Sequence, residues 1–296
     1  MERYFAAIRK GKISAYMELG RPWNALLPSI LLVVSAIVLE TQFEYTKLLL
    51  GATTLFLGYI GGATVNDIVD KVADKINMPY RPIPSGLISE QEAIAFTLVT
   101  YLISVVAALL VSFEFLIVAI IYILLGIFYS APPLSFEKQG IFAQISLAII
   151  TGLMPALGGA VIAVGWNNIP GYWWAAFLSF SLLFAAVLVF KDFKDTRGDR
   201  VAGKTTFVIQ AGEKTAYYSG LVGIAVSYPI VIYSFNGLFN STTFLLLSGI
   251  LGLTIFFIAA KVRKNPERTF AKLRISMLGV ILLLILVALQ IIPKSI

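Results

Sequence analysis

Long hydrophobic stretches separated by short polar segments run along almost the whole chain. A helix needs roughly 20 apolar residues to cross a bilayer. Nine stretches come close to that length: 22–40, 47–66, 92–112, 114–130, 141–165, 171–191, 215–236, 241–261 and 273–292. The pattern therefore predicts an all-α integral membrane protein, with about nine transmembrane helices bundled around a central cavity.

The first 20 residues do not follow this pattern. They carry scattered charges and lack the continuous apolar run of a cleavable signal. Tyr4, Phe5 and Ile8 leave an irregular apolar face beside basic residues. We expect residues 1–20 to lie on the membrane as an interfacial helix, with a frayed tail as the alternative. No linker rich in Pro, Gly or Ser divides residues 21–296, which are expected to form one transmembrane domain.

Composition narrows the chemistry. The chain is 58% hydrophobic and contains neither cysteine nor histidine. Disulfides, thiol chemistry, zinc or haem ligation by these residues and imidazole acid–base catalysis are therefore excluded. The remaining candidates for chemistry are carboxylates, amides, hydroxyls and cations.

The basic residues indicate an orientation. If the N-terminus is cytoplasmic, the inner segments hold 21 of the 23 Lys and Arg, and the outer segments hold only Lys47 and Lys294. Cytoplasmic loops of membrane proteins are enriched in basic residues. We therefore expect a multi-pass protein of the cell membrane with a cytoplasmic N-terminus. The net charge of +7 then reflects orientation and contact with membrane lipids, and no nucleic-acid partner is expected.

All the aspartates fall into two sets with the same D-x2-D-x3-D spacing: Asp67, Asp70 and Asp74, and Asp192, Asp195 and Asp199. On a helix these spacings place each set on one face. Charged groups inside a membrane protein are costly and are rarely idle. Oxygen ligands suit Mg²⁺ or Mn²⁺, and Mg²⁺ usually completes its shell with water or phosphate. Two facing sets would hold metal bridging a diphosphate, whereas capping and ion pairing with nearby bases is the alternative.

The two sets also indicate how the chain is organised. Both fall at the cytoplasmic ends of predicted helices, the second and the sixth, and a long basic loop follows each. The offset of 125 residues spans four helices. This predicts a possible four-helix internal repeat with motifs at 66–74 and 192–199, and a chance match is the alternative.

Several polar residues lie near these motifs in the sequence. Three prolines around Arg81 would hold that side chain in a rigid loop, and Arg is the natural bidentate partner of phosphate. We expect diphosphate contacts from Arg81, Tyr129, Ser130, Lys138, Lys194 and Arg200. At the start of the first predicted span, Arg21 and Asn24 are candidates for binding an acceptor. A plain turn, a helix stop and an Arg reaching lipid phosphate are the corresponding alternatives.

Together these residues resemble the UbiA superfamily of intramembrane prenyltransferases. The matching stretches are Asn66-Asp67-Ile-Val-Asp70-Lys-Val-Ala-Asp74, Asp192-Phe-Lys-Asp195-Thr-Arg-Gly-Asp199, Arg81-Pro82-Ile-Pro84-Ser85-Gly86, Tyr129-Ser130-Ala131-Pro132-Pro133 and Gly203-Lys204-Thr205-Thr206. The resemblance implies that Mg²⁺ on both motifs holds an isoprenyl diphosphate, whose C–O bond ionises before a lipophilic acceptor captures the allylic cation. The metal ligands would be Asn66, Asp67, Asp70, Asp74, Asp192, Asp195 and Asp199. Of these, Asp70, Asp74, Asp195 and Asp199 are expected to be catalytic.

The resemblance leaves the acceptor open. The family includes branches that make archaeal ether lipids from geranylgeranylglyceryl phosphate and branches that prenylate quinone precursors or tetrapyrroles. The predicted sixth helix carries no acid between residues 171 and 190, so a phenolic acceptor would lack a carboxylate base there. This favours geranylgeranylglyceryl phosphate. An ion-coupled transporter is the competing class, but transport sites tend to lie near the bilayer midplane, not at helix ends.

Overall fold

The computed structural model describes residues 11–39, 44–194, 196–201, 203, 205–239 and 241–289. The α-helices in this part of the chain are α2 (Lys12–Gly20), α3 (Pro22–Leu39), α4 (Tyr45–Val69), α5 (Lys71–Asn77), α6 (Glu90–Val111), α7 (Phe113–Ser130), α8 (Ile141–Ala148), α9 (Met154–Val164), α10 (Gly171–Leu188), α11 (Thr196–Val201), α12 (Phe207–Ala211), α13 (Glu213–Phe239), α14 (Thr242–Ala259) and α15 (Pro266–Ala288). A π-helix, Ile149–Leu153, joins α8 to α9, and a 3-10 helix, Val189–Lys194, follows α10.

The predicted membrane-spanning stretches are confirmed. Within the described residues, nine helical segments are long and apolar enough to cross a bilayer. The break at 112–114 is also present, because Ser112 takes an extended conformation and its hydroxyl accepts a hydrogen bond from the Phe115 amide. The first ten residues lie outside the described part. The helix α2 is consistent with the interfacial segment, whose place on the membrane surface stays a prediction.

The chain divides into two compact units. The N-terminal unit runs to Leu32 and continues from Glu44 to Phe136. The C-terminal unit comprises Val33–Phe43 and Glu137–Ile296. The first aspartate motif belongs to the N-terminal unit and the second to the C-terminal unit, and each is described within its own unit.

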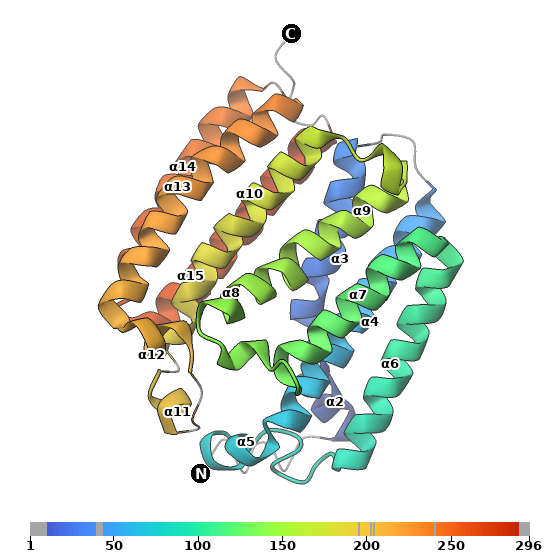
Figure 1. Cartoon of the computed structure of the whole chain (residues 1–296), viewed down its shortest axis with the longest axis vertical. Helices are drawn as coiled ribbons and strands as arrows, with labels where there is room; N and C mark the ends of the chain where they lie inside the picture. Colours follow the sequence, from blue (N-terminus) through green and yellow to red (C-terminus); the bar gives the residue numbers. More distant parts are fainter. Residues whose placement is uncertain are drawn as a thin grey trace. The chain divides into compact units, whose positions relative to one another are not determined.

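In the N-terminal unit, α4 packs against α6 and α7, and the three run side by side in Figure 1. Glycines on α4 make this close packing possible. A Cβ at Gly61 would lie 2.3 Å from the Tyr101 ring on α6, and one at Gly58 would lie 2.9 Å from Tyr122 on α7. Small residues let membrane helices approach closely enough for van der Waals packing to hold them together.

In the C-terminal unit, α10 packs against α13 and α8, while α14 packs against α15 (Figure 1). Glycine again fits beneath an aromatic ring at two close contacts. A Cβ at Gly220 would lie 2.5 Å from Phe190, and one at Gly252 would lie 2.4 Å from Tyr228. Phe190 follows α10 directly, so the contact with Gly220 holds the segment that carries the second aspartate motif.

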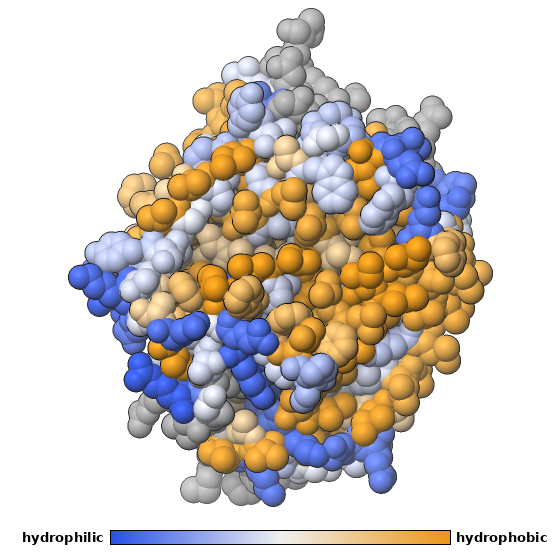
Figure 2. Space-filling view, viewed as in Figure 1, coloured by the Kyte–Doolittle hydropathy of each residue, from blue (hydrophilic) through white to orange (hydrophobic). Residues whose placement is uncertain are grey.

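The outward face of the N-terminal unit is hydrophobic. Figure 2 shows a broad hydrophobic surface over α6 and α7. On α6 the exposed large side chains include Leu98, Leu102 and Leu109, which recur at helical spacing. A soluble protein rarely exposes such a patch, so this face is suited to lipid chains.

Candidate active site

The first motif lies where α4 ends. Asp67 is in the last turn of α4, Asp70 is the residue between the helices, and Asp74 is in α5. Asp70 leaves helical geometry, with φ −82° and ψ 1°. The three carboxylates therefore do not share one unbroken helix, and the expected single helical face is wrong for this set. Hydrogen bonds of helical spacing still cross the junction, from the Asp70 amide to the Asn66 carbonyl (2.9 Å) and from the Asp74 amide to the Asp70 carbonyl (2.8 Å). The bend therefore changes the directions of the carboxylates without separating them.

These three carboxylates are buried. The exposed fractions of Asp67, Asp70 and Asp74 are 3%, 9% and 4%. Removing a carboxylate from water is costly unless a cation or hydrogen-bond donors compensate. The burial therefore requires partners, and the structure supplies them from two other segments.

Two arginines meet the first motif. Arg21 donates from Nη2 to Oδ1 of Asp67. Arg81 donates from Nη1 to Oδ2 of Asp74 (2.5 Å) and approaches Oδ1 of Asp67 (3.5 Å). The predicted proximity of Arg81 to the carboxylates is confirmed. The contact of Arg21 was not predicted, and its proposed role toward an acceptor stays a prediction.

The loop that carries Arg81 is ordered by its own turns. The Arg81 amide donates to the Met78 carbonyl (3.0 Å), and the Ser85 amide donates to the Arg81 carbonyl (3.0 Å). Burial lowers the pKa of Arg81, but the nearby Asp67 and Asp74 carboxylates raise it more, so its net direction is upward. The guanidinium is therefore permanently charged and held at the motif.

An apolar cluster fixes both arginines in place. Its buried members are Ala15 and Leu19 from α2, Ile88 from the loop and Ala93 from α6. Arg21 follows α2 directly, in a left-handed conformation with φ 49°, which costs a non-glycine residue about 1–2 kcal/mol. The cluster anchors α2 and the Arg81 loop together, so the corner at Arg21 points its side chain at Asp67.

Asn66 links the motif to the end of α7. Its Nδ2 donates to the Ser130 hydroxyl (2.9 Å) and lies 3.4 Å from Oδ2 of Asp70. Ser130 is fully buried, and Tyr129 beside it is partly buried. The structure thus gathers Asn66 and Ser130, predicted for different roles, at one place. Asn24, in the first turn of α3, is partly exposed, and its backbone amide donates to the Arg21 carbonyl.

The second motif is built differently. Asp192 lies in the 3-10 helix and is 6% exposed, Asp199 lies in α11, and Asp195 is outside the described residues. The expected single helical face is therefore wrong for this set, because the chain tightens into a 3-10 helix after α10 and then starts a new helix. Lys194 and Arg200 in this segment are exposed.

A partner of Asp192 comes from a helix that none of the sequence motifs includes. Gln144, on α8, donates from Nε2 to Oδ2 of Asp192 at 2.5 Å, and the residue is 4% exposed. A signal existed, because Gln144 is the only amide or charged residue in the predicted span 141–165. A lone amide in a hydrophobic helix is costly unless it has a partner.

The loop before α8 is joined to the segment after the second motif. The Gly140 amide donates to the Thr205 carbonyl at 2.8 Å, and Gly140 forms a parallel bridge with Thr206. The Thr205 hydroxyl also donates to the Lys138 carbonyl. Lys138, predicted to contact diphosphate, is exposed, and its backbone thus belongs to this clasp of residues 138–140 and 205–206.

The donor set of the first motif fits a hard divalent cation. It offers the carboxylates of Asp67, Asp70 and Asp74 and the side-chain oxygen of Asn66, all in one short segment. Oxygen donors of this kind suit Mg²⁺. As placed, the described residues contain no group of three acidic, His or Cys side chains gathered as a ready metal cluster. The arginine contacts of Asp67 and Asp74 show which groups would have to adjust when a cation binds.

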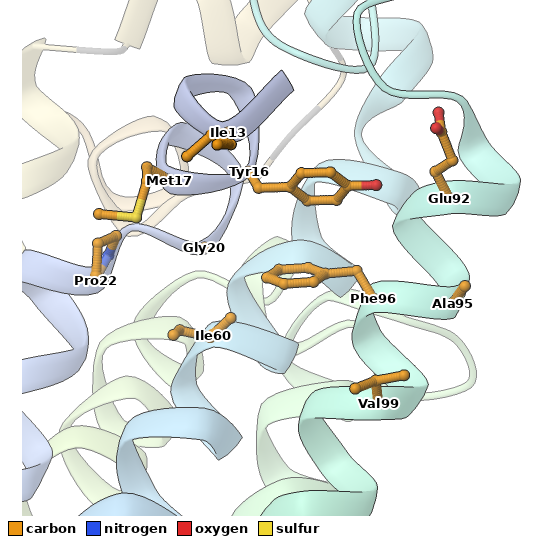
Figure 3. Close-up of a pocket in the computed structure, with 10 residues that line it drawn as sticks. All are labelled: Ile13, Tyr16, Met17, Gly20, Pro22, Ile60, Glu92, Ala95, Phe96 and Val99. Atoms are coloured by element: carbon orange, nitrogen blue, oxygen red, sulfur yellow. The ribbon is translucent and has the colours of Figure 1, made fainter. Parts of the chain in front are cut away.

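An open apolar groove lies in the N-terminal unit, between α2, α4 and α6 (Figure 3). Its volume is about 540 Å³, and its lining includes the Tyr16 and Phe96 rings, 5.0 Å apart between centroids, with Ile60 and Val99. Glu92 is the only charged residue among its described lining. No predicted site residue is among its lining, although Gly20 and Pro22, the chain neighbours of Arg21, are.

Comparison with known proteins identifies relatives of this chain. The model of the UbiA prenyltransferase family matches residues 26–287. The chain is 32% identical over 205 residues to a digeranylgeranylglyceryl phosphate synthase of Methanosphaera stadtmanae, covering 69% of this chain and 71% of the relative. A synthase of the same name from Sulfurisphaera tokodaii is 28% identical over 264 residues, covering 88% and 92%.

A similar fold is known from a solved structure. A UbiA homologue from Archaeoglobus fulgidus, bound to GPP and Mg²⁺, superposes with a TM-score of 0.74 at 19% identity, covering 93% of this chain and 99% of that one. The family match begins within the first of the nine apolar helical segments found in the described residues, reaches the last and includes both aspartate motifs. The chain belongs to the UbiA prenyltransferase family.

Proposed function

We propose that the protein transfers a geranylgeranyl group from geranylgeranyl diphosphate to geranylgeranylglyceryl phosphate, in a reaction that depends on Mg²⁺. One observation carries the proposal: three buried carboxylates and two arginines from separate segments meet at the end of a membrane-spanning helix. A site that binds both a metal and a diphosphate needs negative side chains for the metal and positive side chains for the diphosphate. The isoprenyl chain of the donor is hydrophobic, and a protein embedded in lipid can accommodate it.

The first motif would hold Mg²⁺ through Asp67, Asp70, Asp74 and Asn66. When bound, the metal neutralises charge on the diphosphate and so makes it a better leaving group. We propose that the second motif, Asp192, Asp195 and Asp199, serves the same diphosphate, as the matching spacing and the shared cytoplasmic side predict from the sequence. Asp70, Asp74, Asp195 and Asp199 keep the catalytic roles expected of them.

Arg81 would contact the diphosphate. The turns of its loop hold the backbone of Arg81, and its guanidinium donates a hydrogen bond to Asp74. A small movement of the side chain would let the guanidinium donate to a phosphate oxygen in place of the carboxylate. The fork of Arg suits two phosphate oxygens. Ser130, bound by Asn66, would offer a hydroxyl, while Tyr129, Lys138, Lys194 and Arg200 remain proposed contacts from the sequence.

The reaction breaks the allylic C–O bond of the donor, and the electron pair leaves with the diphosphate oxygen. A hydroxyl oxygen of the acceptor forms the new C–O bond with the allylic carbon. The hydroxyl proton then passes to the released diphosphate, which needs no protein base. A reaction without a protein base is consistent with the composition of α10, which carries no acidic residue from Gly171 to Leu188.

The acceptor assignment rests on the relatives. The two synthases described above carry the name digeranylgeranylglyceryl phosphate synthase, and they match most of this chain. Arg21 and Asn24 are the proposed acceptor contacts. Because 21 of the 23 basic residues fall in the predicted inner segments, we place the N-terminus and the active site on the cytoplasmic side of the cell membrane.

The test is a prenyl-transfer assay with the full chain in liposomes, using radiolabelled geranylgeranyl diphosphate and Mg²⁺. The acceptors offered are geranylgeranylglyceryl phosphate, 4-hydroxybenzoate, 1,4-dihydroxy-2-naphthoate and chlorophyllide. We expect one labelled product, formed only with geranylgeranylglyceryl phosphate and abolished by EDTA. Prenylation of an aromatic acid or of chlorophyllide would move the protein to another branch of the family. If no acceptor is prenylated and no Mg²⁺-dependent diphosphate binding is measured, ion-coupled transport becomes the better explanation.

A further inference from the structure

We propose that Gln144 is a positioning residue, which orients the Asp192 carboxylate so that the second aspartate motif can bind metal. This inference rests on the proposed function, because it assigns Gln144 a role only if Asp192 is a metal ligand. Gln144 lies on α8, which carries neither aspartate motif.

The contact between the two side chains is short and shielded from water. Nε2 of Gln144 lies 2.5 Å from Oδ2 of Asp192, and both residues are more than nine-tenths buried. A hydrogen bond to a charged group contributes about 1.5–3 kcal/mol, more than one between neutral groups. The contact is therefore strong enough to fix the direction of the carboxylate.

The chemistry of the pair decides which end of the amide faces the carboxylate. An ionised carboxylate only accepts hydrogen bonds, so Gln144 must present its NH₂ group to Asp192. The other amide atom, Oε1, is buried and has no hydrogen-bond partner among the described residues. A glutamine kept in a hydrophobic helix with half of its amide unsatisfied pays a desolvation cost that packing alone does not explain.

The backbone around Gln144 is also fixed relative to the second motif. Gly140, one turn before Gln144, is joined to Thr205 and Thr206 beyond the motif by the clasp. The segment 138–144 thus contacts the chain both at Asp192, where the motif begins, and at residues 205–206, which follow it. A side chain on such a frame can hold Asp192 in one orientation.

Ligand-orienting partners of this type are known to matter in metal sites generally. Removing one typically weakens metal affinity or activity by 10–100-fold, because the ligand no longer points at the metal. A purely structural role would instead lower the stability of the protein without changing the metal dependence. These two consequences can be measured separately.

The experiment uses the full chain in lipid nanodiscs and the variant Gln144→Met, which keeps the length of the side chain and removes the donor. Thermal unfolding is followed while Mg²⁺ is titrated in the presence of geranylgeranyl thiolodiphosphate, a donor analogue that ionises poorly. We expect the Mg²⁺ concentration at half-maximal stabilisation to rise at least about tenfold. The Mg²⁺ dependence of turnover should shift in parallel, with a smaller change in the KM for the acceptor.

Two further variants separate positioning from packing. Ser146→Ala is the matched control, because Ser146 is buried on the same helix and, among the described residues, its hydroxyl bonds to the carbonyls of Phe142 and Ala143 and not to the second motif. It should leave the Mg²⁺ midpoint unchanged. Gln144→Asn keeps an amide on a shorter chain and should give a shift between those of the wild type and Gln144→Met, which also covers the case that Gln144→Met fails to fold.

A double-mutant cycle with Asp192→Asn completes the test. If Gln144 acts through Asp192, Gln144→Met should change the Mg²⁺ midpoint by less than about twofold in that background, since the effects of coupled residues do not add. An equal shift in both backgrounds would overturn the proposal. So would an unchanged midpoint in Gln144→Met, even with a lower Tm. If the wild type itself shows no Mg²⁺-dependent stabilisation, the proposed function falls together with this inference.

Discussion

The two aspartate motifs share a spacing but are held by different chemistry. At the first motif, Asp67 and Asp74 pair with Arg21 and Arg81, which come from separate loops. At the second, Asp192 accepts a hydrogen bond from the neutral amide of Gln144. A buried cation compensates the carboxylate charge itself, whereas an amide mainly fixes the direction of the carboxylate.

This difference indicates a division of work. The arginines at the first motif can serve either the carboxylates or an incoming diphosphate, so that motif is suited to exchanging partners when substrate binds. The Gln144 contact adds no positive charge to Asp192, and under the proposed function it orients that carboxylate toward a cation. Equal spacing in the sequence therefore does not imply equal roles, and the following predictions separate the two motifs.

The largest effect is expected from removing one carboxylate in each motif. Asp70→Ala and Asp199→Ala should each lower turnover by about 100- to 1000-fold, because charge on the leaving diphosphate is no longer compensated. Prenyl transfer in liposomes measures this, and an unchanged Tm in each variant shows that the fold is intact. Glu44→Ala, at an exposed acid paired with Lys47, is the matched control. Full activity in either aspartate variant would exclude that motif from the metal site.

A smaller effect should follow from Arg81→Lys, which keeps the charge but loses the fork of the guanidinium. We expect the KM for geranylgeranyl diphosphate to rise about tenfold, with a smaller change in kcat, because phosphate contact is weakened in substrate and transition state alike. Steady-state kinetics with varied donor measures it. An unchanged KM would mean that Arg81 only balances the charge of Asp67 and Asp74.

A moderate loss of stability should follow from Gly140→Ala in the clasp. Gly140 has φ 58° and ψ −122°, a conformation that alanine adopts only under strain of about 1–3 kcal/mol. The new Cβ would also meet Oε1 of Gln210, although that side chain can turn away. Tm should fall and the Mg²⁺ midpoint should rise. Gly126→Ala in α7, where a Cβ meets no atom within 4 Å, should leave Tm equal or higher.

The smallest effect is expected at the edge of the N-terminal unit. Lys12 pairs with Glu92, and the pair lies at the surface. Surface ion pairs contribute little, since water and salt screen them. Lys12→Ala should leave both Tm and turnover unchanged within error at physiological salt. A clear loss of turnover would show that α2 takes part in the reaction beyond holding Arg21.

Local composition was enough to predict two features of the protein. The nine spans follow from the length of the apolar stretches, since a bilayer requires about 20 apolar residues per helix. The position of Arg81 near the carboxylates followed from three prolines within six residues, which stiffen a short loop. Both features are set by neighbours in the chain, and the structure confirms them.

Contacts between residues far apart in the chain depend on how the helices and loops pack. Arg21 and Asp67 lie 46 positions apart, and Gln144 and Asp192 lie 48 apart. The bend at Asp70 and the 3-10 helix at Asp192 also broke the single helical faces that the spacing predicted. Local pattern cannot specify such contacts, because they arise where glycines let helices approach and where apolar clusters fix loops. The spacing of the aspartates identified the chemistry, and packing between segments selected the partners of each carboxylate.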